Sequence, residues 1–223
     1  QIDNSYVGNN TNDYIDTGAG NDTINGGAGV DSIDGGAGND TVNISAIVAG
    51  GAGYSRWLVN SGSGDTAIQY DSSYAAITTA LSGGTAFSLQ YVNSNWTTQL
   101  TLKNVENWNV LAGSHYGDLL IVHGTGTQLD GGAHDSVGYD TLYADWSTAT
   151  NAISWVNAPG TTQVVNGDTF SGLERMLVTT GSGNDQIDNS YTGNNTNDYI
   201  DTGAGNNTIN GGAGVDSIDG GAG

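Results

Sequence analysis

The stretch TGAGNDTIN (17–25), GGAGVDSID (26–34) and GGAGNDTVN (35–43) repeats one pattern every nine residues. In each segment, glycines at fixed offsets precede one aspartate and one β-branched residue. The glycines allow positive φ and close backbone approach, so the first six residues form a turn. The remaining three are long enough for a minimal strand. A short fixed period of this kind predicts a β-solenoid, in which each segment adds one turn and one strand.

An aliphatic residue recurs with the same period, and we expect it to point into the spiral. These residues are Ile15, Ile24, Ile33 and Val42. Two segments then complete one coil of a flattened right-handed spiral, and successive turns alternate between its two rims. The motif aspartates divide accordingly, with Asp13 and Asp31 on one rim and Asp22 and Asp40 on the other. Because adjacent strands lie ~4.7–4.9 Å apart, each rim stacks oxygens across a gap that a divalent cation can bridge.

A second, much longer period surrounds the first. Residues 1–38 recur as residues 186–223, identical at 36 of 38 positions. The two differences are Val7→Thr192 and Asp22→Asn207. We therefore expect a tandem array with a period of 185 residues, of which this chain is just over one unit.

The composition argues against several classes of partner and of metal site. The chain has 23 acidic residues against Arg56, Lys103 and Arg175, a net charge of -20, and no cysteine. This charge argues against nucleic acid and anionic membrane partners, because both are bound through lysine and arginine clusters. The absence of cysteine excludes disulfides and thiolate metal sites. Since no 18-residue apolar run or charged leader occurs, we expect neither membrane insertion nor a signal peptide in this piece.

The acidic residues favour calcium. All but two are aspartates, whose short side chains hold a carboxylate next to the carbonyls that turns expose. Calcium accepts ~6–8 oxygen ligands in loose geometry, whereas magnesium demands a stricter octahedron and zinc prefers nitrogen or sulfur. Without the cation the stacked carboxylates repel, so we expect binding and folding to be coupled.

The rest of the chain indicates an all-β fold. Short runs rich in threonine, valine, isoleucine and aromatic residues predict strands. They lie at 56–60, 66–70, 75–81, 85–92, 97–102, 118–124 and 162–167. We expect parallel β-roll segments at 1–43 and 181–223, flanking a β-rich middle at 44–180 that comprises two related modules, about 44–130 and 131–180. The sequence leaves open whether the middle continues the solenoid or packs beside it.

Two weak correspondences suggest that the middle is duplicated. Residues 64–81 resemble residues 138–155, which aligns Asp65 with Asp140. Residues 103–121 resemble residues 170–187, which aligns Glu106 with Glu174. Matching glutamates favour a structural role, such as packing at a corner or an additional calcium ligand.

The tracts 8–43 and 181–223 resemble the RTX (repeats-in-toxin) calcium-binding β-roll repeats of bacterial proteins exported by type I secretion. The resemblance implies calcium ligands at one aspartate per repeat and at the carbonyls of turn glycines. The aspartates are Asp13, Asp22, Asp31, Asp40, Asp185, Asp198 and Asp216. The glycines are Gly18, Gly20, Gly27, Gly29, Gly36, Gly38, Gly203, Gly205, Gly212 and Gly214.

Some repeats depart from this pattern. The segments 8–16 and 193–201 (GNNTNDYID) lack the motif glycines at their second and fourth positions, and Asn207 replaces an aspartate. We expect weak or empty sites there. The spacer NSYT (189–192) stretches the step from Asp185 to Asp198 to thirteen residues, which predicts a bulge in the coil.

The same residues admit other interpretations. An aspartate at a glycine turn can cap an Asx turn, but a nine-residue lattice favours calcium. No common spacing unites His115, His123 and His134, so a zinc site is disfavoured. The tryptophans could form a sugar-binding platform, although such residues more often lie in a core. They are Trp57, Trp96, Trp108, Trp146 and Trp155. Because H-E-x-x-H and G-x-S-x-G are absent, we expect no enzymatic activity.

The leading functional expectation is architectural. We expect a calcium-stiffened rod within a large secreted or cell-surface adhesin or fibre, whose partners are neighbouring copies, other fibres or cell-surface glycans. One alternative is a glycan- or partner-binding module formed by residues 44–180. A second is the secretion and folding domain of an exoenzyme.

Overall fold

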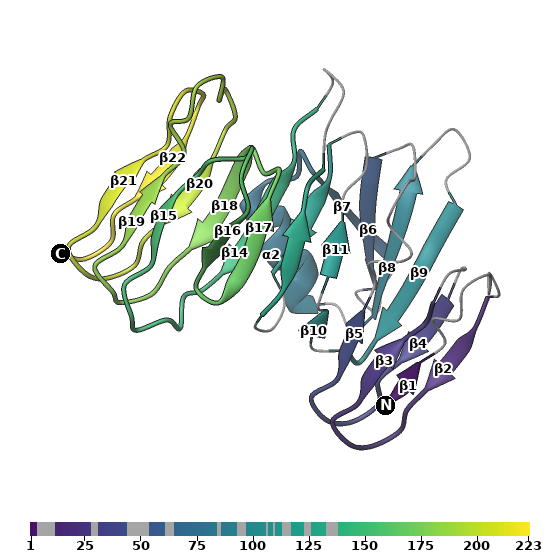
Figure 1. The fold of residues 1–223 in the computed structure, drawn as a ribbon. Helices are drawn as coiled ribbons and strands as arrows, with labels where there is room; N and C mark the ends of the chain where they lie inside the picture. The colour runs from purple at the N-terminus through teal and green to yellow at the C-terminus, as the bar shows by residue number, and fades with distance from the viewer. Residues whose placement is uncertain are drawn as a thin grey trace.

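The computed structural model describes residues 1–3, 12–27, 31–43, 54–60, 65–83, 86–92, 97–105, 107–108, 110–112, 117–122, 126–132 and 138–223. Within these ranges the chain consists of short strands and one helix, so the all-β prediction is confirmed. The chain termini lie at opposite ends of the molecule (Figure 1). Gly29, Trp96, Glu106 and the three histidines fall outside the described ranges.

The N-terminal segment forms the predicted spiral. Its strands are β1 (Ile2–Asp3), β2 (Tyr14–Asp16), β3 (Thr23–Asn25), β4 (Asp31–Asp34) and β5 (Thr41–Asn43). Strand β2 pairs with β4, and β3 pairs with β5, in parallel and eighteen residues apart, so that Ile15 faces Ile33 and Ile24 faces Val42. The four side chains are at most 8% exposed. Two nonapeptides therefore complete one coil, as the period predicts. Strand β1 pairs with β3 in parallel, with Ile2 twenty-two residues from Ile24.

The C-terminal segment repeats this arrangement. Its strands are β19 (Gln186–Asp188), β20 (Tyr199–Asp201), β21 (Thr208–Asn210) and β22 (Ser217–Asp219). Ile200 pairs with Ile218, again eighteen residues apart, but Ile187 pairs with Ile209, which is twenty-two residues away. The four additional residues are the spacer 189–192. The predicted bulge is confirmed.

The middle adds rungs to both rolls, and among the described strands no pairing joins the two sets of rungs. Its parallel rungs are β9 (Thr97–Lys103), β10 (Asn107–Trp108), β11 (Val110–Ala112), β12 (Leu119–Ile121), β13 (Gln128–Asp130), β14 (Thr141–Asp145), β15 (Ser154–Val156), β17 (Asp168–Ser171) and β18 (Arg175–Thr179). The N-terminal roll enters it where β4 pairs with β9 and β5 with β10. The middle joins the C-terminal roll where β18 pairs with β20 and β15 with β19. A short strand, β16 (Gln163–Val165), pairs antiparallel with β17.

One elaboration leaves the spiral (Figure 1). Strands β6 (Tyr54–Asn60), β7 (Asp65–Gln69) and β8 (Ala86–Val92) form an antiparallel meander that joins the sheet of the N-terminal roll through β9. The indole Nε1 of Trp57 donates to the carbonyl of Leu119, 2.8 Å away, which attaches the meander to the spiral.

The strand predicted at 75–81 is wrong, because these residues belong to helix α2 (Tyr74–Gly83). The Ser73 hydroxyl accepts the amide of Ala76, 3.2 Å away, and caps the helix start. Ile77 and Ala80 are buried at i, i+3 spacing, which is a helical pattern. The β-branched residues of this run conceal that spacing in the sequence.

The two suggested correspondences fare differently. Residues 64–81 form β7 and α2 outside the spiral, whereas β14 lies within it, so the alignment of Asp65 with Asp140 is wrong. The alignment of residues 103–121 with 170–187 has a structural counterpart. The amide of Gly35 donates to the Lys103 carbonyl, and that of Gly131 donates to the Ser171 carbonyl.

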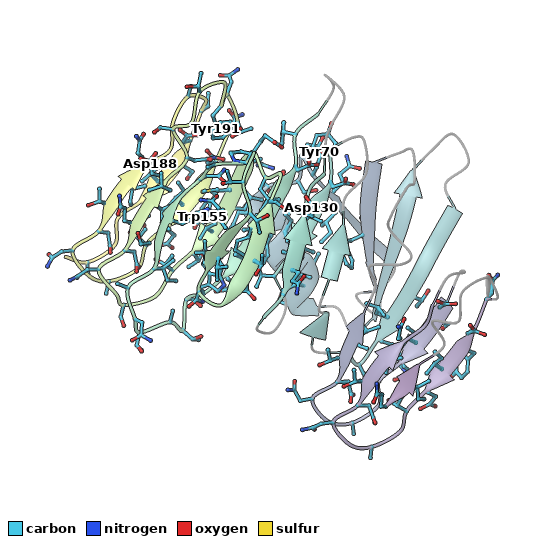
Figure 2. All side chains as sticks on the ribbon, in the orientation of Figure 1. Tyr70, Asp130, Trp155, Asp188 and Tyr191 are labelled. Carbon is cyan, nitrogen blue, oxygen red and sulfur yellow. The ribbon has the colours of Figure 1, made fainter. Side chains whose placement is uncertain are left out.

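An aromatic cluster fills the middle of the spiral. Trp146, Trp155 and Phe170 pack with ring centroids 5.4 to 6.3 Å apart, and each is at most 5% exposed. Figure 2 shows Trp155 inside the ribbon. In the described part of the chain, no helix has the length and apolarity needed to cross a membrane.

Candidate metal centre

The motif aspartate ends each turn, immediately before a strand. One of its carboxylate oxygens, Oδ1, accepts a backbone N–H from the preceding coil. The distances are 3.1 Å for Asp31 (from Asp13), 2.8 Å for Asp40 (Asp22), 2.8 Å for Asp185 (Ile153), 2.8 Å for Asp198 (Met176) and 3.0 Å for Asp216 (Asp198). Each aspartate therefore clamps two coils together, a role that the period alone does not reveal.

Three further acidic residues make the same clamp in the middle. The acceptors are Asp140 (2.8 Å from the Asp118 amide), Asp168 (2.8 Å from that of Thr127) and Glu174 (2.8 Å from that of Asp140). Insertions in the middle stretch the coil spacing to 22, 41 and 34 residues. The nine-residue period therefore does not reveal these positions. Of the three, the sequence predicted a role only for Glu174, as a corner-packing residue or an additional calcium ligand, and its clamp is a structural role of this kind.

The second carboxylate oxygen, Oδ2, lies against the first glycine of its segment. A Cβ on Gly26 would lie 2.6 Å from Oδ2 of Asp31, and one on Gly211 would lie 2.5 Å from that of Asp216. Gly131 and Asp140 repeat this geometry at 2.6 Å. For Asp31 and Asp140 this oxygen is buried without a hydrogen-bond partner. A buried, unsatisfied oxygen is costly, and a bound cation removes that cost.

Burial also changes the ionisation of these acids. Desolvation, followed by the charge of Asp13, raises the pKa of Asp31 despite the stabilising Asp13 amide. Desolvation together with Asp118 and Glu174 raises the pKa of Asp140 to about 9. An uncompensated negative charge is therefore unfavourable at Asp140.

The contacts of Asn207, which replaces a motif aspartate, show which groups surround the position of the aspartate Oδ2. Its Oδ1 accepts the Asp185 amide at 2.8 Å, so it makes the usual clamp. Its Nδ2 stands where an aspartate has Oδ2, and it donates to the carbonyls of Thr202 and Gly220, both 3.2 Å away. Two backbone carbonyls from successive coils thus converge on this point.

Asp22 occupies the same place in the nearly identical N-terminal copy. By the 185-residue offset, its matching carbonyls are those of Thr17 and Gly35. The Gly35 carbonyl already accepts the Thr17 hydroxyl at 2.8 Å, and the Asp22 carboxylate adds a further acceptor beside the two carbonyls. Oxygen acceptors gathered in this way suit a hard cation. Across the described residues, no three Asp, Glu or His side chains converge. Backbone carbonyls are therefore needed to complete such a site, and the residues fit calcium on these terms.

Two of the predicted ligands already have a second partner. The Thr180 hydroxyl donates to Oδ2 of Asp185 at 2.5 Å. The Asn189 amide donates to Oδ2 of Asp198 at 2.8 Å, and the Thr196 hydroxyl donates to its Oδ1 at 3.1 Å. Desolvation still raises the pKa of Asp198 to about 6. Asn189 belongs to the spacer and Thr196 replaces a motif glycine, so the irregular residues here supply donors.

The side chain of Arg175 provides a fixed positive charge on the same rim. It is 7% exposed. Its Nε donates to the Asn197 carbonyl at 2.7 Å, and its Nη1 donates to the carbonyls of Tyr70 and Ser72, both 2.9 Å away. The guanidinium therefore gathers backbone oxygens as a bound cation would.

The predicted glycines shape the turns. The glycine at the second position of a segment has φ between 61° and 86°. Its N–H donates to the Asp or Asn side chain two residues earlier, at 3.0 to 3.2 Å. These residues are Gly18, Gly27, Gly36, Gly203 and Gly212. The glycine at the fourth position of a segment has φ between 122° and 144°. These residues are Gly20, Gly38, Gly205 and Gly214. Coils approach so closely that a Cβ on Gly36 would lie 1.7 Å from the Gly18 carbonyl oxygen.

The Asx turns are therefore real, but a different residue makes them. The strand-end residue, such as Asp16 or Asp34, accepts the glycine N–H, and the motif aspartate is left for the clamp. Some predicted ligand carbonyls also serve the backbone, since the Gly18 carbonyl accepts the Ala37 amide at 2.7 Å.

Comparison with known proteins agrees with this geometry. Residues 7–42 and 192–223 match the family model described as the RTX calcium-binding nonapeptide repeat. The chain thus carries RTX repeats at both ends, and these repeats are calcium-binding. No curated protein matches the chain.

Proposed function

We propose that this chain, which carries RTX calcium-binding nonapeptide repeats at both ends, is a non-enzymatic structural unit of a large secreted or cell-surface protein. Tandem units fold on calcium into a stiff rod that serves adhesion or extracellular assembly. Export by type I secretion fits a chain that stays unfolded at low calcium and folds outside the cell.

The observation that carries this proposal is that the first 38 residues of the spiral recur in its last 38 residues. Residues 1–38 and 186–223 are nearly identical, and both form parallel rungs with the same register. Among the described strands, β9 and β10 extend the N-terminal roll, and β11 to β15, β17 and β18 form parallel rungs that lead into the C-terminal roll. A unit whose end reproduces its beginning can be extended without limit, which suits a spacer.

RTX repeats are typical of secreted proteins, and this supports an extracellular location. The net charge of -20 suits a rod that repels its neighbours, or that binds other fibres through further calcium. Cell-surface glycans are further partners proposed for such a fibre.

The tryptophans give little support to a glycan-binding platform. Trp57, Trp146 and Trp155 are at most 5% exposed and belong to the core. The Trp96 residue and the Trp108 side chain are outside the described part of the chain. We therefore favour the rod over the binding module and over the secretion domain of an exoenzyme.

Small-angle X-ray scattering on chains of one, two and four repeats tests the proposal. In calcium, we expect the maximum dimension to grow linearly with repeat number at constant cross-section. In EDTA, we expect an expanded chain without a defined cross-section. A maximum dimension that stops growing between two and four repeats would show a globular assembly instead.

A further inference from the structure

The same 38-residue sequence occurs twice in this chain in two different settings. The C-terminal copy is covered by the middle, whereas the N-terminal copy begins an open end of the spiral (Figure 1). Where both copies are described, their comparison shows which contacts of the C-terminal copy are missing from the N-terminal copy.

The tyrosine of the YID strand differs most between the copies. Tyr14 is 74% exposed. Its counterpart Tyr199 is stacked on Tyr74 of helix α2, with ring centroids 4.0 Å apart and planes 9° apart. Tyr74 is held from its other side by Tyr143, at 5.3 Å, and its hydroxyl lies 2.6 Å from that of Thr179. Tyr199 therefore completes a three-ring stack between α2 and the spiral.

The neighbouring aliphatic residues follow the same trend. Ile2 is 38% exposed, whereas its counterpart Ile187 is fully buried against β15. Ile15 is 8% exposed, whereas Ile200 is fully buried and pairs with Val178 of β18. The N-terminal copy thus presents an apolar edge whose identical counterpart is covered by a known surface.

The other end of the spiral is complementary. Ile218 of β22 is 49% exposed, but its counterpart Ile33 is 1% exposed, because β4 is covered by β9. Each end of the chain thus exposes side chains whose identical counterparts at the other end are covered.

We infer that consecutive repeats join without a linker, with β15 and β18 of one repeat pairing with β1 and β2 of the next. Tyr14 of each repeat then stacks under Tyr74 of the repeat before it. The partner of the open N-terminal edge is a second copy of this chain, seated in the register Leu177 to Tyr14 and Val178 to Ile15. This joint rests on the proposed tandem rod, and it specifies how the rod transmits force between units.

The joint also includes a rim clamp. In the C-terminal copy, the amide of Met176 donates to Asp198, which is the counterpart of Asp13. The same amide in the preceding repeat reaches Asp13, so the ladder of clamps crosses the repeat boundary uninterrupted.

The test compares two tyrosines of identical local sequence by amide hydrogen exchange in calcium. In the 223-residue chain, Tyr199→Ala should speed exchange in β20 by at least about tenfold. Tyr14→Ala, the matched control, should leave β2 unchanged. In a chain extended by one preceding 185-residue repeat, β2 should exchange at least about tenfold more slowly than in the single chain. There, Tyr14→Ala should remove that protection.

If β2 exchanges equally fast in both chains, or Tyr14→Ala is silent in the longer one, the joint is wrong. Scattering from the same extended chain separates this failure from that of the proposed function. A calcium-dependent rod with a silent Tyr14 overturns only the joint, whereas a compact chain with a protected β2 overturns only the rod.

Discussion

At the residue scale, one position of each repeat decides whether a rung needs a cation. Asp22 and Asn207 differ by a single atom type in nearly identical segments. The amide of Asn207 satisfies two backbone carbonyls by itself. A carboxylate cannot do so, because it is an acceptor only. The chain therefore contains one rung with an acceptor-only side chain at this position and an equivalent rung with a donor there.

Exchanging these two residues should exchange their calcium dependence. Asn207→Asp places an oxygen against the carbonyls of Thr202 and Gly220. In EDTA it should lower the free energy of unfolding by about 1 kcal/mol, and calcium should restore it. Thermal unfolding in both buffers measures the effect.

The reverse substitution, Asp22→Asn, is the control. It should be stabilising in EDTA and should weaken the response to calcium. Equal melting temperatures of the parent chain and Asn207→Asp in EDTA would show that the two carbonyls do not matter.

The site residues were predictable from the sequence only where the period is regular. Asp31 follows directly from the nine-residue lattice. Asp140 makes the same clamp over Gly131, but the intervening insertion conceals it. Asn189 and Arg175 were missed for another reason. Neither is a calcium ligand type at a motif position, and their hydrogen-bond donors reach the rim only through the folding of distant segments.

At the element scale, the elaboration formed by the meander and α2 is attached to the spiral by a few specific contacts. Arg175 is the most connected of these, because it binds the turn before α2 and the rim near Asn197. Burial lowers the pKa of this guanidinium, which the nearby Tyr139 and acidic side chains oppose. The guanidinium stays charged, because arginine is effectively always protonated in proteins.

Arg175→Met should leave the carbonyls of Tyr70, Ser72 and Asn197 with fewer donors. We expect the free energy of unfolding to fall by about 3 kcal/mol, as measured by urea denaturation in calcium. Lys103→Met is the matched control. Lys103 is half-exposed and pairs with Asp34 at 2.8 Å, and a surface pair of this kind contributes about 0–1 kcal/mol. Equal losses for the two variants would contradict the special role of Arg175.

The elements themselves were partly predictable. Six of the seven predicted middle runs contain strands of the structure. The exception, 75–81, shows the limit of composition, because Ser73 and the spacing of Ile77 and Ala80 outweigh the β-branched residues. The very short rungs, such as β15, carry too few residues to be recognised without their neighbours.

At the scale of the whole molecule, the spiral is stabilised in two ways. In the N-terminal roll, Asp31 has a buried oxygen that no protein group satisfies. In the middle and at its border with the C-terminal roll, protein groups substitute for a cation. They are the Thr180 hydroxyl, the Asn189 amide and the Arg175 guanidinium.

This division predicts a folded middle that supports calcium-dependent ends. The rod would then be assembled from units that fold first in the middle and extend outward as calcium binds. Such a sequence of events keeps the register of the rolls fixed, because β9 and β18 are already in place to receive β4 and β20.

Amide hydrogen exchange of the 223-residue chain in calcium, in magnesium and in EDTA is the direct test of whether a cation holds the N-terminal rungs together. We predict that EDTA abolishes protection in 12–43 but leaves 141–179 protected, and that only calcium restores the first segment. Equal protection of residues 12–43 in all three buffers would contradict the claim that a cation holds these rungs together.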